Sequence, residues 1–85
     1  MLTMDEVFEL IRKEREHQDK KWGTLSEKQQ TCAGFMMVMR HELSEAEVGW
    51  MKNAEGRHSA LAEIVQVAAT AVACLQQHGA EGNPL

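Results

Sequence analysis

Apolar residues recur along this chain at the spacing of α-helices and not in the strict alternation of strands. Near the amino terminus the set at helical spacing is Met4, Val7, Phe8 and Ile11. Thr3 precedes this set and Glu6 follows Thr3 by three residues, which is the pattern of a capping box. These signals predict a first helix from Thr3 to about Lys21, ended by Gly23.

A second capping box is indicated where Ser26 is followed three residues later by Gln29. The helix that it opens is expected to continue to Met51 or Lys52. Residues 53–56, Asn-Ala-Glu-Gly, are the next turn signal and are expected to end it.

The third helix is expected to begin at about Arg57 or Ser59 and to end at Gln77. His78 suits its negative end, and Gly79 stops it. The 85 residues fit a single domain, 1–85, in which 80–85 are expected to be a frayed tail.

Together these segments predict an all-α chain of three helices in up-down-up order. The run 35–39, Phe-Met-Met-Val-Met, is apolar around the whole helix circumference, so one partner helix cannot cover it. We therefore expect a dimer or higher oligomer, in which the second and third helices form a four-helix core with a second chain. The alternative is a compact three-helix monomer that uses Met as filler.

Composition narrows the classes of partner. The net charge of -4 and the absence of a basic stripe argue against nucleic acid, and no segment is expected to be apolar enough to span a membrane. Cys32 and Cys74 both lie in helical patterns, and no secretory leader precedes them. We expect a cytoplasmic protein in which both cysteines are reduced, buried and apolar in character.

The third helix carries one conspicuous carboxylate. From Ser59 to Leu75 the only charged residue is Glu63, which shares a face with Gln66 and Thr70. The opposite face is apolar: Leu61, Ile64, Val65, Ala68, Val72 and Leu75. A solvated face would carry several charges, so Glu63 is predicted to face a packed or half-enclosed space, where it needs a partner. That partner is either a cation or an Arg or His of another helix.

The second helix favours the cation. Glu42 and Glu45 are three residues apart on one edge of its apolar stripe, where like charges repel. Glu47 projects on the outer side and is assigned to solvent. We therefore predict that Glu42, Glu45, Glu63 and the amide oxygen of Gln66 converge on one metal ion. Oxygen ligands alone suit Mg²⁺ or Mn²⁺, and Mg²⁺ typically brings phosphates with it, which points to phosphate-ester or anhydride hydrolysis.

The first helix begins with an apolar face that continues as Glu14, Arg15, Gln18 and Trp22, as expected of a helix that lines a cavity. Arg15, Gln18, Lys21 and Trp22 are the candidate substrate-binding residues, with Lys21 for phosphate and Trp22 as a flat surface for a base. The alternative is that Trp22 covers the helix end and that Lys20 and Lys21 form a solvated last turn.

In these residues the chain resembles the MazG-like, all-α nucleoside triphosphate pyrophosphohydrolases. That family has Glu-x-x-Glu on one helix and Glu-x-x-Asp on the next; here the segments are 42–45, Glu-Leu-Ser-Glu, and 63–66, Glu-Ile-Val-Gln. The segment 14–23 also resembles the end of the first helix in short, phage-type members. The resemblance spans roughly residues 7–77.

The resemblance implies Mg²⁺-dependent cleavage of a (deoxy)nucleoside triphosphate to the monophosphate and pyrophosphate, often to remove non-standard nucleotides. It implies that Glu42, Glu45 and Glu63 are metal ligands with a catalytic role, in a homodimer or dimer of dimers. The departure is Gln66, where the family usually has Asp, so the site loses one negative charge.

Two other classes are weighed. Gln66 favours a non-catalytic helical oligomer that binds nucleotides or a protein partner in the same cleft. The spacings Glu14-x-x-His17 and Glu55-x-x-His58 are those of ferritin-like di-iron sites. We interpret them as coincidence, because Gly56 interrupts the second pair and the first lies in a charge-dense helix.

Overall fold

The computed structural model describes residues 1–52 and 56–79, and for 56–59 it describes the backbone alone. It contains three helices, α1 (Met4–Trp22), α2 (Cys32–Lys52) and α3 (Gly56–His78), and no strand in these ranges. The predicted all-helical class is therefore confirmed. The predicted turn at 53–55, the predicted tail at 80–85 and Glu55 of the second Glu-x-x-His spacing lie outside the described residues.

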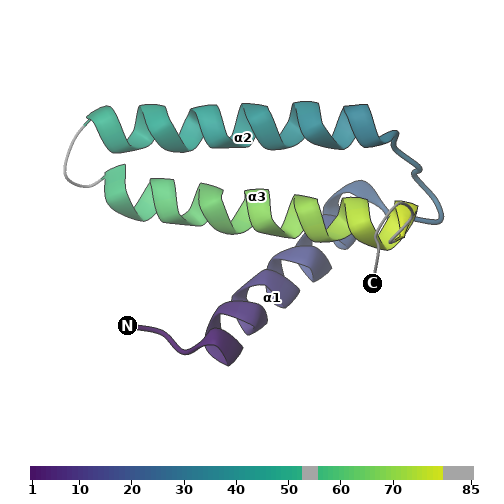
Figure 1. Cartoon of the computed structure of the whole chain (residues 1–85), viewed down its shortest axis with the longest axis horizontal. Coiled ribbons are helices and arrows are strands. Elements are labelled where there is room, and N and C mark those ends of the chain that lie inside the picture. The colour runs from purple at the N-terminus through teal and green to yellow at the C-terminus, as the bar shows by residue number, and fades with distance from the viewer. Residues whose placement is uncertain (53–55, 80–85) are drawn as a thin grey trace.

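The helices α2 and α3 run antiparallel along their lengths, and α1 crosses the carboxyl-terminal half of α3 obliquely (Figure 1). Among the described helices, α1 packs on α3 and not on α2. The chain thus has the predicted number of helices, but α1 is not a third parallel member of the bundle.

Both ends of α1 lie where the sequence predicts them. The Thr3 side chain accepts a hydrogen bond from the Glu6 backbone, and the Glu6 carboxylate accepts one from the Thr3 N–H at 2.9 Å. At the other end Gly23 adopts a φ of 93°, which favours glycine, and its N–H donates to the Asp19 carbonyl. Local signals alone determine these two ends.

The start of α2 differs from the prediction. Thr24 and Glu27 form one isolated turn, in which the Glu27 carboxylate accepts the Thr24 N–H at 3.0 Å, and the helix begins only at Cys32. Its true cap is Thr31, whose hydroxyl accepts the Gly34 N–H at 2.9 Å. The capping box predicted at Ser26 was wrong because contacts distant in sequence hold this segment.

Those contacts come from the last turn of α3. The Gln77 amide donates to the Leu25 carbonyl and accepts from the Gln30 N–H, both at 2.8 Å. The His78 ring lies 2.7 Å from the Gln30 carbonyl and edge-on to Phe35. The loop between α1 and α2 therefore satisfies its backbone against α3 instead of continuing as helix.

The residues buried within one chain are mostly small. They are Phe35, Ala46, Ala60, Ala69 and Ala73, together with the polar Arg15 and Thr70. Alanines on the facing sides of α2 and α3 allow the two backbones to approach closely. Most large residues of the apolar face of α3 are exposed, with Ile64 at 49% and Leu75 at 64%. The expectation that both cysteines are buried was wrong, because Cys32 is exposed while Cys74 is half-buried.

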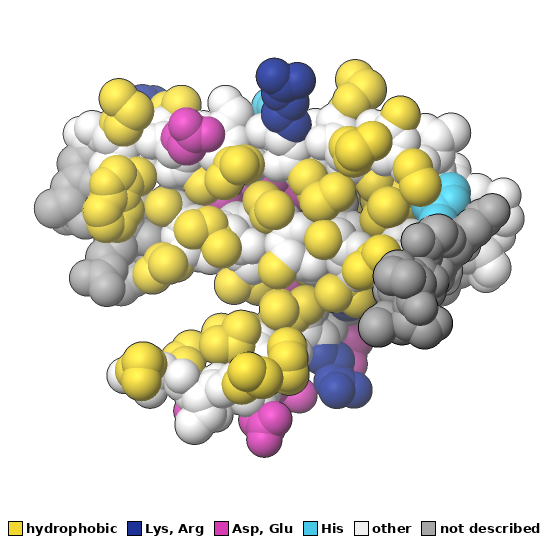
Figure 2. Space-filling view, in the orientation of Figure 1, with side chains coloured by type: hydrophobic (Ala, Val, Ile, Leu, Met, Phe, Trp, Pro, Cys, Tyr) yellow, Lys and Arg dark blue, Asp and Glu magenta, His cyan; other side chains and the backbone are white. Residues whose placement is uncertain are grey.

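Figure 2 shows the result as a broad apolar face over α2 and α3 that continues onto α1. Within the described ranges one helical stretch, Ala60–His78, is also long and apolar enough to cross a membrane, with a mean hydropathy of 1.3. The expectation that no segment would be so apolar was wrong. This is weak evidence for a membrane, because the core helix of a soluble protein meets the same criterion.

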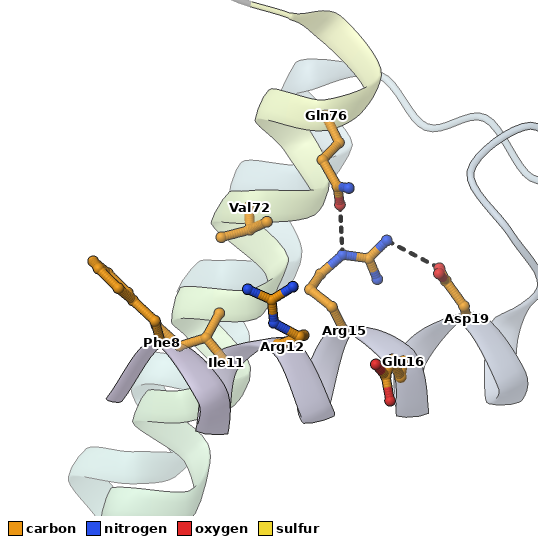
Figure 3. Close-up of a pocket in the computed structure, with 8 residues that line it drawn as sticks. All are labelled: Phe8, Ile11, Arg12, Arg15, Glu16, Asp19, Val72 and Gln76. Carbon is orange, nitrogen blue, oxygen red and sulfur yellow. Dashed lines mark hydrogen bonds and ion pairs between the residues drawn. The ribbon is translucent and has the colours of Figure 1, made fainter. Parts of the chain in front are cut away.

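A buried guanidinium fixes α1 on α3. Arg15 is only 8% exposed, and its Nε donates to the Gln76 amide oxygen at 2.9 Å. Its other nitrogens donate to Gln18 at 3.2 Å and Asp19 at 3.0 Å. Beside it, an open groove of about 470 Å³ lies between α1 and α3, and Val72 forms part of its apolar wall (Figure 3). Arg15 is therefore a buried polar contact that joins α1 to α3.

Replacing Arg15 by Ala is expected to lower the free energy of unfolding by about 2–3 kcal/mol, because Gln76 and Asp19 lose a buried charged donor. Arg12→Ala is the matched control, since Arg12 is exposed and pairs only with Glu9 at 3.6 Å; its effect should stay below about 0.5 kcal/mol. Urea unfolding followed by circular dichroism measures both. Equal effects would show that Arg15 does not hold α1.

Candidate metal centre

The middle of α2 and the middle of α3 direct acidic and amide side chains at one another. One tip atom of the Gln66 amide lies 3.1 Å from Glu63 Oε2 and 3.2 Å from Glu42 Oε2. If that atom is nitrogen, the amide donates to both carboxylates; if it is oxygen, three oxygens face one another and need a cation or a proton between them. Gln66 thus bridges one carboxylate from each helix.

Glu45 joins this group from the solvent side. Its charge raises the pKa of Glu63, and its side chain is 50% exposed. On its outer side Nε2 of His41 lies 2.8 Å from Glu45 Oε1. The structure therefore brings Glu42, Glu45, Glu63 and Gln66 into one cluster, which we call the acidic cluster.

Burial and nearby negative charge raise the pKa of two carboxylates of the acidic cluster, Glu42 and Glu63. Burial raises the pKa of Glu42 above its ordinary value of 4.5; a hydrogen bond from Thr70 lowers it, and the charges of Glu14 and Glu45 raise it. Burial also raises the pKa of Glu63, and the charges of Glu45 and Glu42 add to this. Each of these two carboxyl groups therefore ionises at a higher pH than one in water, and a bound cation would lower its pKa again.

The Thr70 hydroxyl is shared between two acceptors. It lies 2.9 Å from Glu42 Oε1 and 2.8 Å from the Gln66 carbonyl oxygen, and it has a single proton to donate. It also accepts from the Gln18 amide at 3.3 Å. When Thr70 donates to the backbone, an ionised Glu42 loses its donor, which adds to the need for a proton or a cation there.

The structural ion pair considered for Glu63 is not seen in the described part of the chain, where the recorded pairs are Arg12–Glu9, Arg15–Asp19 and His41–Glu45. Within the same residues no three His, Cys, Asp or Glu side chains already surround one point as they would a bound metal. The space between Glu42 and Glu63 is taken by the Gln66 amide. Metal binding would therefore require this amide to present its oxygen and the carboxylates to move inward.

The four substrate-binding candidates of α1 divide into two pairs. Arg15 and Gln18 point to α3, and Gln18 reaches Thr70, so this pair is linked to the acidic cluster through hydrogen bonds. A substrate phosphate would have to displace an acceptor of Arg15. Lys21 and Trp22 are exposed at the end of α1, with the Lys21 ammonium 5.0 Å from the Trp22 ring. No contact between this second pair and the cluster is recorded for the described residues.

Three residues at the site were not predicted to act there. Thr70 was placed on the correct face of the third helix but given no role, although a lone hydroxyl among alanines is a usable signal. His41 precedes Glu42 and reaches Glu45 one turn further on, which i,i+4 spacing suggests. Glu14 contributes charge near Glu42 from α1, and only the packing of α1 reveals it. Glu47 is exposed, as predicted.

Comparison with models of known protein families, with curated proteins and with solved structures finds no match to this chain. The MazG-like resemblance therefore rests on the residues quoted above.

In the absence of divalent cations, Glu42 and Glu63 are expected to lower the free energy of unfolding as the pH rises above about 4.5. In the folded chain both ionise above their ordinary pKa of 4.5, so between the two values the folded state holds more protons than the unfolded state. The free energy of unfolding then decreases with pH. Urea midpoints of the parent and of Glu42→Gln, from about pH 4 to about pH 8, measure this contribution.

The difference between variant and parent cancels the effect of Glu6 and Glu27. Hydrogen bonds from Thr3 and Thr24 lower the pKa of these two carboxylates, so they act in the opposite direction. Glu47→Gln removes an exposed carboxylate of the same helix and serves as the control. A Glu42→Gln profile parallel to that of the parent would contradict the assignment.

Proposed function

We propose that this chain is a Mg²⁺-dependent nucleoside triphosphate pyrophosphohydrolase of the MazG-like kind. The observation that carries the proposal is the pairing of half-buried Glu42 and Glu63 across Gln66, with no ion pair to Glu63 among the described residues. Carboxylates are rarely held this way unless a cation or a proton completes the site. The resemblance at 42–45 and 63–66 identifies the cation and the reaction.

The donor set fits Mg²⁺. Three carboxylates and one amide supply only hard oxygen ligands, and Glu42, Glu45, Glu63 and Gln66 would hold the ion. Mn²⁺ suits the same ligands. When bound, the metal would supply charge stabilisation at the phosphates and would lower the pKa of an attacking water.

The remaining residues would orient the metal ligands and the attacking water, and would bind the substrate. Thr70 fixes one oxygen of Glu42, and Gln18 carries that contact to α1. Glu45 is the most exposed of the three carboxylates, so we assign to it the orientation of the water that attacks the α-phosphorus. Lys21 and Trp22 are free at the surface to contact a phosphate and a base.

We also assign the apolar face of α2 and α3 to a second copy of the chain. Leu43, Ile64 and Leu75 are about half exposed or more, and apolar faces of this extent on soluble monomers are uncommon. An isologous contact through this face would give the four-helix core expected from the sequence. Each of the two chains would then supply one acidic cluster, on the side of α3 opposite to this contact.

The purified chain is expected to sediment as a dimer or a multiple of it, with a mass of at least twice 9.6 kDa. Ile64→Glu places a charge in the centre of the apolar face and should shift the population to monomer at micromolar concentration. Lys13→Glu, an exposed change on α1, should leave the mass unchanged. A parent that sediments at 9.6 kDa would contradict the assembly.

With Mg²⁺ present, at least one nucleoside triphosphate of a panel is expected to yield monophosphate and pyrophosphate, measured by coupled pyrophosphate release. Glu42→Gln and Glu63→Gln should lower kcat/KM by about 100-fold or more, because each removes a charged ligand. Glu47→Gln should remain within about twofold, since this carboxylate is exposed and is not a predicted ligand.

The second candidate function is a non-catalytic nucleotide-binding oligomer, which Gln66 favours because its amide closes the cluster without any metal. The same panel separates the two. If no nucleotide is turned over and Glu63→Ala leaves nucleotide binding intact, the hydrolase proposal fails.

A further inference from the structure

The face of α1 that meets α3 is polar where it is covered and apolar where it is exposed. Arg15 and Gln18 hold the carboxyl-terminal half of α1 on α3 through hydrogen bonds. The amino-terminal half, residues 4–11, which we call the arm, diverges from the α2–α3 pair (Figure 1). On the same face of the arm, Met4 is 71% exposed and Phe8 54% exposed. The apolar part of this face is therefore the part that its own chain leaves uncovered.

The direction of the arm is fixed by the same contacts. A helix bends sharply only at a Pro, a Gly or a comparable break, and the arm contains neither Pro nor Gly. To turn onto its own α3, it would therefore have to break the hydrogen bond between Arg15 and Gln76. Helical spacing places its acidic residues, Asp5, Glu6 and Glu9, opposite its apolar ones. The arm thus presents a fixed apolar ridge to its surroundings.

An open apolar groove of about 360 Å³ lies between the last turns of α2 and the first turns of α3, and we call it the end groove. Buried Ala46 and Ala60 lie along its floor, and exposed Leu43 and Trp50 stand beside them. Small residues between large ones form a groove that fits a ridge of large side chains on another helix. Along α2 the groove extends from Leu43 to Met51, about 12 Å, and the arm is about 10 Å long.

The exposed area of the chain is that of a protein with a missing partner. The chain exposes 6843 Å², whereas a folded monomer of 9.6 kDa typically exposes about 5,100 Å², which is about 1,700 Å² less. The nine residues outside the described ranges can contribute at most about 1,300 Å², the surface of an extended chain of that length. With them left out of both figures, the surplus is still about 800 Å². A stable interface buries about 800 Å² on each partner, so the surplus matches one second copy.

We propose that two copies of this chain exchange their arms, so that the arm of each lies in the end groove of the other. A two-fold axis generates the contact twice and leaves no open end. The contact is continuous with the apolar face of α2 and α3 (Figure 2), because Ile64 belongs both to that face and to the end groove. The inference rests on the dimer proposed above and is independent of the hydrolase activity.

Photochemical cross-linking of the full-length chain tests the exchange. Benzoylphenylalanine replaces Phe8 in an isotope-labelled chain, which is refolded together with unlabelled chain, irradiated, digested and analysed by mass spectrometry. The expected cross-link joins residue 8 of a labelled chain to the end groove, within residues 43–51 or 60–64, of an unlabelled chain. The same analogue at exposed Lys13, on the opposite side of α1, should give no such link. Links confined to one chain, or links between two arms, would overturn the proposal.

A double-mutant cycle tests the same contact without a probe. Phe8→Ala and Trp50→Ala should each raise the Kd of the dimer by about tenfold or more, measured by analytical ultracentrifugation. Because the two side chains are expected to touch, the double variant should raise the Kd by less than the product of the two effects. In the control pair, Phe8→Ala with Leu75→Ala, the effects should multiply, since Leu75 lies near the other end of α3.

The outcomes separate the arm exchange from the dimer itself. If the parent is a dimer and the effects of Phe8→Ala and Trp50→Ala are absent or multiply, the arm exchange is wrong and the dimer stands. A parent that sediments at 9.6 kDa would overturn both. Both side chains are more than half exposed in the single chain, so each variant is expected to fold, which circular dichroism checks.

Discussion

The structure depends on how the half-buried carboxylates of Glu42 and Glu63 are accommodated between two tightly packed helices. A neutral amide, that of Gln66, is the group between them, and it supplies hydrogen bonds but no charge. Burial and mutual repulsion therefore keep the pKa of both carboxylates raised. Since an arrangement that works against folding is seldom retained without use, it marks the place where chemistry is expected.

The close approach of α2 and α3 brings these carboxylates together, and it also leaves large apolar residues exposed elsewhere on the surface. Small residues such as Ala69 and Ala73 occupy the inner side of α3, so its large residues, among them Ile64 and Leu75, must lie on the outer side. The chain thus buries little apolar volume by itself. The acidic cluster and the exposed apolar face are consequences of the same distribution of side-chain sizes.

The sequence predicted both ends of α1, the end of α3 and the residues of the acidic cluster, because caps and helical spacing are local properties. It failed at the start of α2, where Gln77 and His78 hold the loop from across the chain. It also identified the larger apolar face of α3, but hydrophobicity alone does not tell whether such a face is covered within the chain or left exposed. The burial of Arg15 follows from the crossing of α1 over α3, which no pattern within α1 encodes.

Gln66 suits both states of the proposed metal site, with and without a cation. An aspartate there would add another negative charge beside Glu42 and Glu63 and would leave no donor between them, so the metal-free chain would be destabilised. Glutamine donates to both carboxylates when the site holds no cation, and after rotation of its amide it presents an oxygen to one. In the proposed metal site, Gln in place of Asp would therefore lower the affinity for a cation and stabilise the metal-free fold, and a metal would bind reversibly to a chain that is already folded.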